Sequence, residues 1–138
     1  MIVYLDTSTV LRVLFQQGKR LAAWGRWEEA YSSELLGVEG RRAIDRLRLE
    51  SALDDEGVAR AQEELVRIEQ SIHLIALTRA VLRRAAQPMA TVVRTLDAMH
   101  LASAAILREG VGSHLVFATH DARQRTAARA FGFECIGV

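Results

Sequence analysis

Residues 2–8 read Ile2-Val3-Tyr4-Leu5-Asp6-Thr7-Ser8, an apolar run with a β-branched bias that ends at an aspartate and two hydroxyl residues. A short apolar run is typical of a buried strand, and Asp, Thr and Ser are residues that begin helices. The stretch therefore predicts a buried strand that leads, through Asp6, into a helix over Val10–Phe15. This strand-to-helix step is the unit from which α/β folds are built.

Further strands and helices alternate along the chain. Strands are expected at Ile72–Leu77, His114–Ala118 and Phe133–Val138. Helices are expected over Leu21–Ala30, from Tyr31 through Leu49, from Asp54 to Ile68, over Ala80–Ala86, over Ala98–Leu107 and from Asp121 to Gly132. The alternation predicts an α/β sandwich with a parallel sheet, in which a functional site lies outside the carboxyl ends of the strands.

Length and composition limit the possible classes of protein. The 138 residues suit one domain, residues 1–138, and the composition of 50% apolar and 25% charged residues is that of a soluble globular protein. No apolar run is long enough to span a membrane, and the first residues lack the features of a secretion signal, so we expect a cytoplasmic protein. Cys135 is the only cysteine, which excludes an intrachain disulfide and a cysteine-based zinc site.

Four carboxylates stand at positions where two explanations compete. Asp6, Asp97 and Asp121 each come just before a predicted helix, and capping alone would explain each of them. Hydroxyl residues beside them can cap without adding a charge. Glu39 lies inside a predicted helix and interrupts its apolar face, where the alternative role is an ion pair with Arg42 three residues later.

If the four carboxylates converge, they need a compensating cation, because neighbouring carboxylates repel one another in a cleft. Oxygen ligands without cysteine favour Mg²⁺ or Mn²⁺ over zinc. A cation of this kind, held by carboxylates, suits phosphodiester hydrolysis. Glu34 lies close to Glu39 in the sequence, and the apolar setting of Glu39 makes it the preferred candidate.

Four segments together resemble the PIN-domain family, in particular the VapC-type toxins of toxin–antitoxin pairs. The matching segments are Ile2–Ser8, Glu39, Leu96–Ala104 and Phe117–Asp121, the last followed by Ala127-Ala128 and Phe131-Gly132-Phe133. Their order and spacing span nearly the whole chain. The resemblance implies a Rossmann-like three-layer sandwich with a mostly parallel sheet.

The same resemblance implies an Mg²⁺- or Mn²⁺-dependent endoribonuclease that acts on RNA, usually forms a homodimer and is inhibited by a cognate antitoxin. Asp6, Glu39, Asp97 and Asp121 would be the catalytic acids, and Asp6, Asp97 and Asp121 would bind the metal. Glu39 would bind metal through water or orient the attacking water. Thr7, Ser8 and Thr119 would position the carboxylates.

Two roles remain open for His100, which follows Asp97 by three residues: a core histidine with satisfied hydrogen bonds, which we favour, or a group that contacts a carboxylate or RNA. Several arginines near the acids in sequence are candidates for phosphate contacts, and the sequence does not choose among Arg12, Arg41, Arg42, Arg94, Arg123 and Arg125. A DNase activity is compatible with the same ligands. The alternative function is a catalytically silent PIN-like module that binds RNA or a protein. Phosphate-binding glycine loops are absent, which argues against nucleotide binding.

Overall fold

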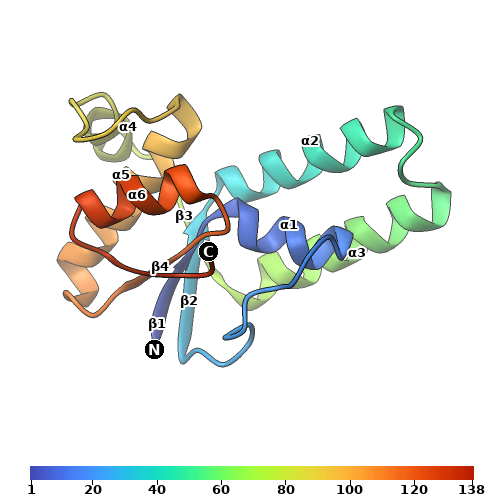
Figure 1. The fold of residues 1–138 in the computed structure, drawn as a ribbon, viewed down its shortest axis with the longest axis horizontal. Coiled ribbons are helices and arrows are strands. Elements are labelled where there is room, and N and C mark those ends of the chain that lie inside the picture. Colours follow the sequence, from blue (N-terminus) through green and yellow to red (C-terminus); the bar gives the residue numbers. More distant parts are fainter.

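A computed structural model describes residues 1–138, and its centre is a five-stranded parallel sheet with the strand order β3-β2-β1-β4-β5 (Figure 1). The strands are β1 (Ile2–Leu5), β2 (Glu29–Ser33), β3 (His73–Ile75), β4 (Val116–Ala118) and β5 (Glu134–Ile136). The helices are α1 (Thr7–Phe15), α2 (Leu35–Leu49), α3 (Asp55–Ser71), α4 (Arg79–Ala85), α5 (Thr95–Val111) and α6 (Ala122–Ala130). The predicted α/β class with a parallel central sheet is confirmed.

Apolar side chains on the two faces of the sheet enter different clusters. On one face, Tyr4 and Phe117 pack with residues of α5 and α6, among them Leu101 and Ala128. Alternate residues of the same strands, such as Val3, point to the other face and pack against the segment that contains Leu21, Trp24 and Trp27. The central strand β1 is thus covered on both sides, which explains why its sequence is continuously apolar.

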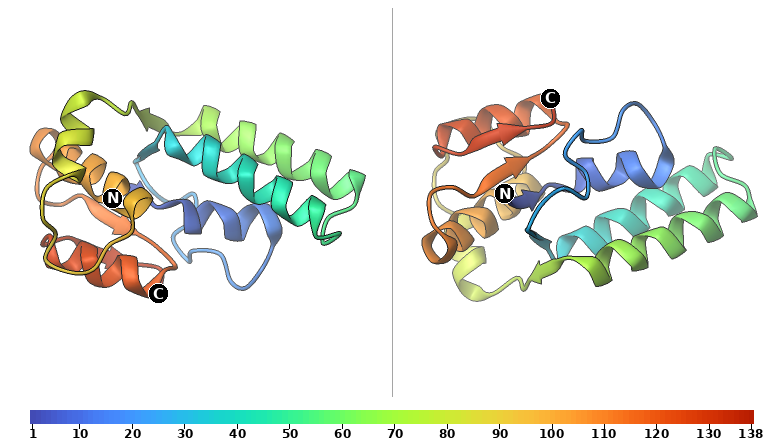
Figure 2. Two further views of the ribbon diagram at one scale, coloured as in Figure 1. Left: turned by 90° about the horizontal axis from the view of Figure 1, so that it is seen from above. Right: turned by 90° about the horizontal axis from the view of Figure 1, so that it is seen from below.

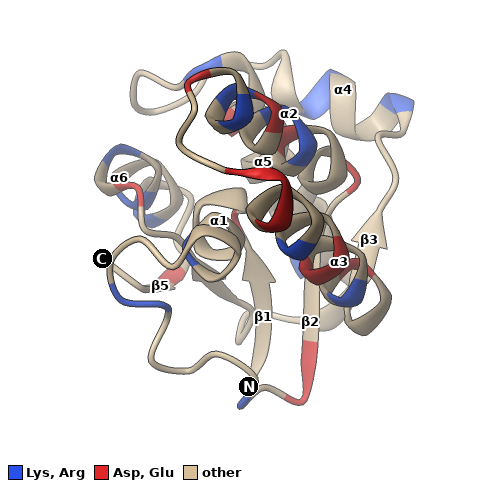
Figure 3. Cartoon of the chain, turned by 90° about the vertical axis from the view of Figure 1, so that its right-hand side faces the viewer, with Lys and Arg blue, Asp and Glu red and all other residues tan.

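Helices α1, α2 and α3 form a third cluster beyond the sheet. Figure 2 shows α2 and α3 side by side, extending away from the strands with α1 beside them. Val10, Leu36, Ile44 and Leu65 are buried where the three helices meet. Figure 3 shows charged residues along α2 and α3 and none on β1, as expected for amphipathic helices and a buried strand.

The prediction of a helix over Leu21–Ala30 is wrong. The structure has a turn in this region, with Gly25 at φ 78°, followed by β2 from Glu29. Trp24 and Trp27 are apolar because they cover the sheet, with their rings edge to face at 5.1 Å, and not because they share a helix face. Consequently the third predicted helix begins at Leu35 and not at Tyr31.

The remaining predicted elements appear with small shifts at their ends. Thr78 caps α4 by accepting a hydrogen bond from the Val81 amide, and α5 is largely buried, as its apolar sequence predicts. None of the helices combines the length and apolar character needed to cross a bilayer.

Candidate active site

The carboxyl ends of β1 and β4 bring the first two parts of the site together. Leu5 pairs with Ala118 in the parallel register, so the next residues, Asp6 and Thr119, lie side by side at the edge of the sheet. The Asp6 amide donates to the Ala118 carbonyl at 2.9 Å, which continues the strand pairing to the site. The position of Asp6 is therefore fixed by the central sheet.

Asp6 occupies the N-cap position of α1, yet its side chain makes no capping hydrogen bond. Its Oδ2 accepts hydrogen bonds instead from Ser8 and from Thr119, both at 2.8 Å. The residue is only 4% exposed, and its Oδ1 has no hydrogen-bond partner. Capping, the alternative explanation for Asp6, thus does not account for this side chain.

Glu39 reaches across from α2 to α1 and α5. Its Oε1 accepts a hydrogen bond from the Thr7 hydroxyl at 2.8 Å and one from His100 Nε2 at 2.6 Å. Arg42 pairs with Asp45 at 3.1 Å, so the expected alternative, an ion pair between Glu39 and Arg42, is wrong. Glu34, the other candidate, is exposed at the start of α2 and does not enter the site.

His100 is fully buried, and both of its ring nitrogens have partners. Nδ1 lies 2.7 Å from the Tyr4 hydroxyl, and Nε2 donates to Glu39. Both roles considered for His100 meet here: it is a core histidine with satisfied hydrogen bonds, and it holds a carboxylate. Complete burial excludes direct contact with RNA in this conformation.

Burial and charge oppose each other in the His100–Glu39 pair. Burial alone would lower the pKa of His100, but the hydrogen bond to Glu39 and the negative charges around it raise the pKa above its usual value. Burial alone would raise the pKa of Glu39, but the hydrogen bond and charge of His100, together with the Thr7 hydroxyl, lower it. Glu39 is therefore kept as a carboxylate.

Asp97 lies in the first turn of α5, after the N-cap residue Arg94, so it is not the cap of that helix. No side chain donates a hydrogen bond to its carboxylate. Its pKa is raised, first by burial and then by the charges of Asp6 and Asp121. The raised pKa shows that the negative charges of this site act on one another.

Asp121 is the one aspartate of the four acids for which the capping explanation holds. Its Oδ1 accepts hydrogen bonds from the amides of Arg123 at 2.8 Å and Gln124 at 3.1 Å, at the start of α6. Its other oxygen, Oδ2, has no hydrogen-bond partner. The residue caps α6 and still turns one oxygen toward the site.

All four acids line one pocket of about 330 Å³, although they come from four separate parts of the chain. Ser8, Thr7, Arg42 and Arg46 also line this pocket, which we call the acid pocket. The strand ends, α2, α5 and the start of α6 each contribute one acid. The structure thus gathers the four carboxylates that the sequence singles out.

The donor chemistry of the acid pocket suits a hard divalent cation. Every acid has at least one carboxylate oxygen without a hydrogen-bond partner, and cysteine is absent from the lining. No three His, Cys, Asp or Glu side chains are already arranged around a common point at ligand distances. Mg²⁺ does not require such a cage, because it keeps several waters and binds proteins through one or two carboxylates.

Three residues of the site escape prediction from the sequence. Tyr4 supports His100, Gln124 donates to the Asp97 carbonyl at 3.0 Å, and Arg46 lines the acid pocket beside Arg42. Tyr4 looks like an ordinary apolar strand residue, and Gln124 gives no signal because its partner is far away in the sequence. Arg46 could have been found from its helical spacing, since it follows Arg42 by four residues.

The chain is similar to known proteins over nearly all of its length. Ribonuclease VapC47 from Mycobacterium tuberculosis (strain CDC 1551 / Oshkosh) is 28% identical over 138 residues, which cover 95% of this chain and 93% of that protein. The crystal structure of VapBC2 from Rickettsia felis, bound to a DNA fragment from its promoter, contains a chain with the same fold. The TM-score is 0.64 at 10% identity, with 98% of this chain and 97% of that chain covered. The model of the PIN domain family matches residues 3–130, and the chain therefore belongs to the PIN domain family.

Proposed function

We propose that this protein is a metal-dependent endoribonuclease and the toxin of a toxin–antitoxin pair. One observation carries the proposal: Asp6, Glu39, Asp97 and Asp121 line a single pocket at the carboxyl end of the sheet. The relative named Ribonuclease VapC47 and the fold of the VapBC2 structure support the activity and the pairing with an antitoxin. RNA is the substrate, and the reaction is hydrolysis of a phosphodiester bond.

Asp6, Asp97 and Asp121 are the residues that would hold Mg²⁺ or Mn²⁺. When bound, the cation polarises the phosphoryl oxygen and stabilises the charge that develops on the leaving oxygen. Ser8 and Thr119 both donate to the same oxygen of Asp6, so that Oδ1 is the atom left for the cation. Asp121 is held in place by its capping bonds to α6.

Glu39 is the residue that orients the attacking water. Thr7 and His100 occupy its Oε1, and Oε2 is left to accept a hydrogen bond from water in the acid pocket. Because the pKa of Glu39 is lowered, the side chain is an ionised acceptor at neutral pH. This role needs no change of its protonation state before the water binds.

The test is cleavage of RNA by the purified protein with and without a divalent cation. We expect cleavage in Mg²⁺ or Mn²⁺, loss of cleavage in chelator and recovery when the cation is restored. Asp6→Asn should lower the rate at least about 100-fold, as expected when a main charged group of a site is lost. Asp55→Asn, an exposed acid in the first turn of α3, is the matched control and should cleave like wild type.

Equal cleavage by a folded Asp6→Asn variant would contradict the mechanism. Binding of RNA without any cleavage, in every cation tried, would instead support the alternative of a silent PIN-like module. The biological role is tested by expression in the absence of an antitoxin, which should slow growth. We further expect a small antitoxin gene next to this one, a cytoplasmic location and a homodimer in solution, which light scattering would measure.

A further inference from the structure

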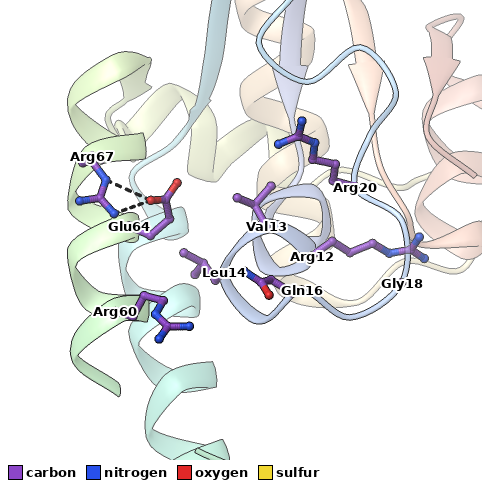
Figure 4. A pocket seen from close by; sticks show the side chains of 9 residues that line it. All are labelled: Arg12, Val13, Leu14, Gln16, Gly18, Arg20, Arg60, Glu64 and Arg67. Carbon is purple, nitrogen blue, oxygen red and sulfur yellow. Dashed lines mark hydrogen bonds and ion pairs between the residues drawn. The ribbon is translucent and has the colours of Figure 1, made fainter. Parts of the chain in front are cut away.

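A second hollow, of about 410 Å³, lies between the C-terminal end of α1, the loop that follows it and α3 (Figure 4). Its charged lining consists of Arg12, Arg20, Arg60, Arg67 and Glu64, and we call it the arginine hollow. Arg60 and Arg67 come from α3, whereas Arg12 and Arg20 come from α1 and the loop (Figure 4). None of the four acids of the acid pocket lines this hollow.

The positive charge of the arginine hollow is largely uncompensated. Its only acid, Glu64, is occupied by Arg67, whose Nε and Nη2 donate to the same oxygen at 3.0 and 2.6 Å. Arg12 donates to the backbone carbonyl of Lys19 at 3.0 Å, a contact that leaves its charge unneutralised. Arg20 and Arg60 make no hydrogen bond or ion pair with a side chain. Three guanidinium charges therefore face one hollow without an opposite charge.

The loop that carries Arg20 is shaped by the backbone. Gln16 at φ 52° and Gly18 at φ 72° are in the left-handed region, so the chain turns back at the end of α1. The Arg12 guanidinium then holds the loop through Lys19. This turn brings Arg20 to the same side of α1 as Arg60.

The arginine hollow is connected to the acid pocket by shared residues. A smaller hollow of about 360 Å³ between them shares Arg12 and Gly18 with the arginine hollow, and it shares Leu11 and Arg46 with the acid pocket. Arginines thus follow the surface of α1 from the acids onward. From Asp6 to Arg12 the helix advances by about 9 Å at 1.5 Å per residue, a distance of the order of one or two nucleotides.

We propose that the arginine hollow binds a backbone phosphate of single-stranded RNA, one or two nucleotides away from the phosphate that is cleaved. This inference rests on the proposed function, because the ligand is the RNA substrate. Guanidinium groups bind phosphate oxygens through paired hydrogen bonds and suit such a site better than lysine. An acidic protein segment is the competing ligand. Only Val13 and Leu14 among the lining residues are apolar, whereas the core of a protein interface is usually apolar.

The experiment measures binding without cleavage. A labelled single-stranded RNA is titrated with the full-length protein in chelator, and the affinity is followed by fluorescence anisotropy at several salt concentrations. The double variant Arg20→Gln/Arg60→Gln should bind about tenfold more weakly than wild type, and the slope of log affinity against log salt should fall by about 1.4 for two lost contacts. Arg79→Gln/Arg83→Gln is the control with the same change in net charge, because both residues are exposed on α4 and line neither the acid pocket nor the two hollows beside α1.

Three outcomes would overturn the inference. Equal weakening by both double variants would show a general charge effect and no site. Unchanged RNA binding by Arg20→Gln/Arg60→Gln would remove the site altogether. Unchanged RNA binding with weaker binding of an acidic peptide would assign the hollow to a protein partner. Because cleavage plays no part in the measurement, failure of the proposed nuclease function, seen as absent metal-dependent cleavage, is recorded separately.

Discussion

Glu39 is ionised because of the residues behind it. Its carboxylate contacts Thr7 and His100, and His100 is in turn held by Tyr4 on the central strand. An unpaired buried carboxylate would be neutralised by a shift of its pKa, whereas a carboxylate beside a buried imidazole keeps its charge. The buried side of the site thus prepares the charge on the open side.

The His100–Glu39 pair should stabilise the protein most strongly in a defined range of pH. The raised pKa of His100 adds stability below pH 6.5, and this stability is lost as the pH rises through the folded value. The lowered pKa of Glu39 adds stability above pH 4.5, and this is lost as the pH falls through its folded value. His100→Asn should therefore lower the free energy of unfolding by about 2 kcal/mol between these pH values and by less outside them.

Urea denaturation at a series of pH values measures this difference. His114→Asn is the matched control, because His114 is exposed and makes no hydrogen bond through its side chain. A loss of stability in His100→Asn that does not vary with pH would indicate a packing role alone. His100→Asn should also lower kcat for RNA cleavage, since Glu39 loses its support, with less effect on KM.

At the scale of helices, one residue of the site has two tasks. Asp121 caps α6 through Oδ1 and presents Oδ2 to the acid pocket. A change that removes both tasks at once cannot tell structure from chemistry. Serine separates them, because its hydroxyl can cap a helix but carries no charge.

Asp121→Ser should therefore keep stability within about 0.5 kcal/mol of wild type, whereas Asp121→Ala should lose about 1 kcal/mol with the cap. Both variants should lose metal-dependent cleavage to a similar extent. Thermal unfolding and cleavage rates measure the two effects. Full activity of Asp121→Ser would show that Asp121 serves the helix and not the reaction.

The glycines beside Glu39 are explained by the packing of α2 on α3. A Cβ atom on Gly40 would lie 2.9 Å from the side chain of the fully buried Leu65. Glycine here lets the two helices approach, at the cost of helix propensity. The helix α2 nevertheless runs unbroken through Glu39.

Alanine at Gly40 should therefore give no gain in stability, because the contact with Leu65 offsets the improved helix propensity. Gly110 is the matched control, because it lies in α5 and a Cβ atom added there would have no neighbouring atom within 4 Å. Gly110→Ala should raise the free energy of unfolding by about 0.5–1 kcal/mol. Equal gains in the two variants, measured by urea denaturation, would contradict the close packing at Gly40.

At the scale of the whole molecule, the fold holds like charges together. Asp97 has a raised pKa because of burial and because of the charges of Asp6 and Asp121, which arrive from different elements. A carboxyl group with a raised folded pKa costs stability when it is ionised, above its usual pKa. A bound cation removes this cost and should stabilise the folded protein.

Without a divalent cation, Asp97→Asn should be at least as stable as wild type. Addition of Mg²⁺ should raise the Tm of wild type by several degrees, at about 3 °C for each kcal/mol of binding free energy. The Tm of Asp97→Asn should respond much less. Thermal scans with Mg²⁺, Mn²⁺ and chelator measure this, and an equal rise in both proteins would show that the cation binds elsewhere.

Most of the elements could be predicted from local patterns, and the exception is instructive. Ile2–Leu5 and Ala98–Leu107 reveal their buried positions through apolar composition alone. The segment Leu21–Ala30 misleads because its tryptophans are apolar for packing against the sheet, which imitates the apolar face of a helix. Residue type reports burial here, and not the backbone conformation.

The sequence by itself determined the α/β class, the strand that ends at Asp6 and the choice of four acids, because these depend on patterns within short segments. Only the tertiary structure decided which explanation holds for each acid, since capping and charge pairing differ by contacts between residues far apart in the chain. It also placed Tyr4 behind His100 and connected Arg46 and Arg12 into a path beside the acids. The physical reason is that strand register and helix packing set these distances, and neither is encoded within any one segment.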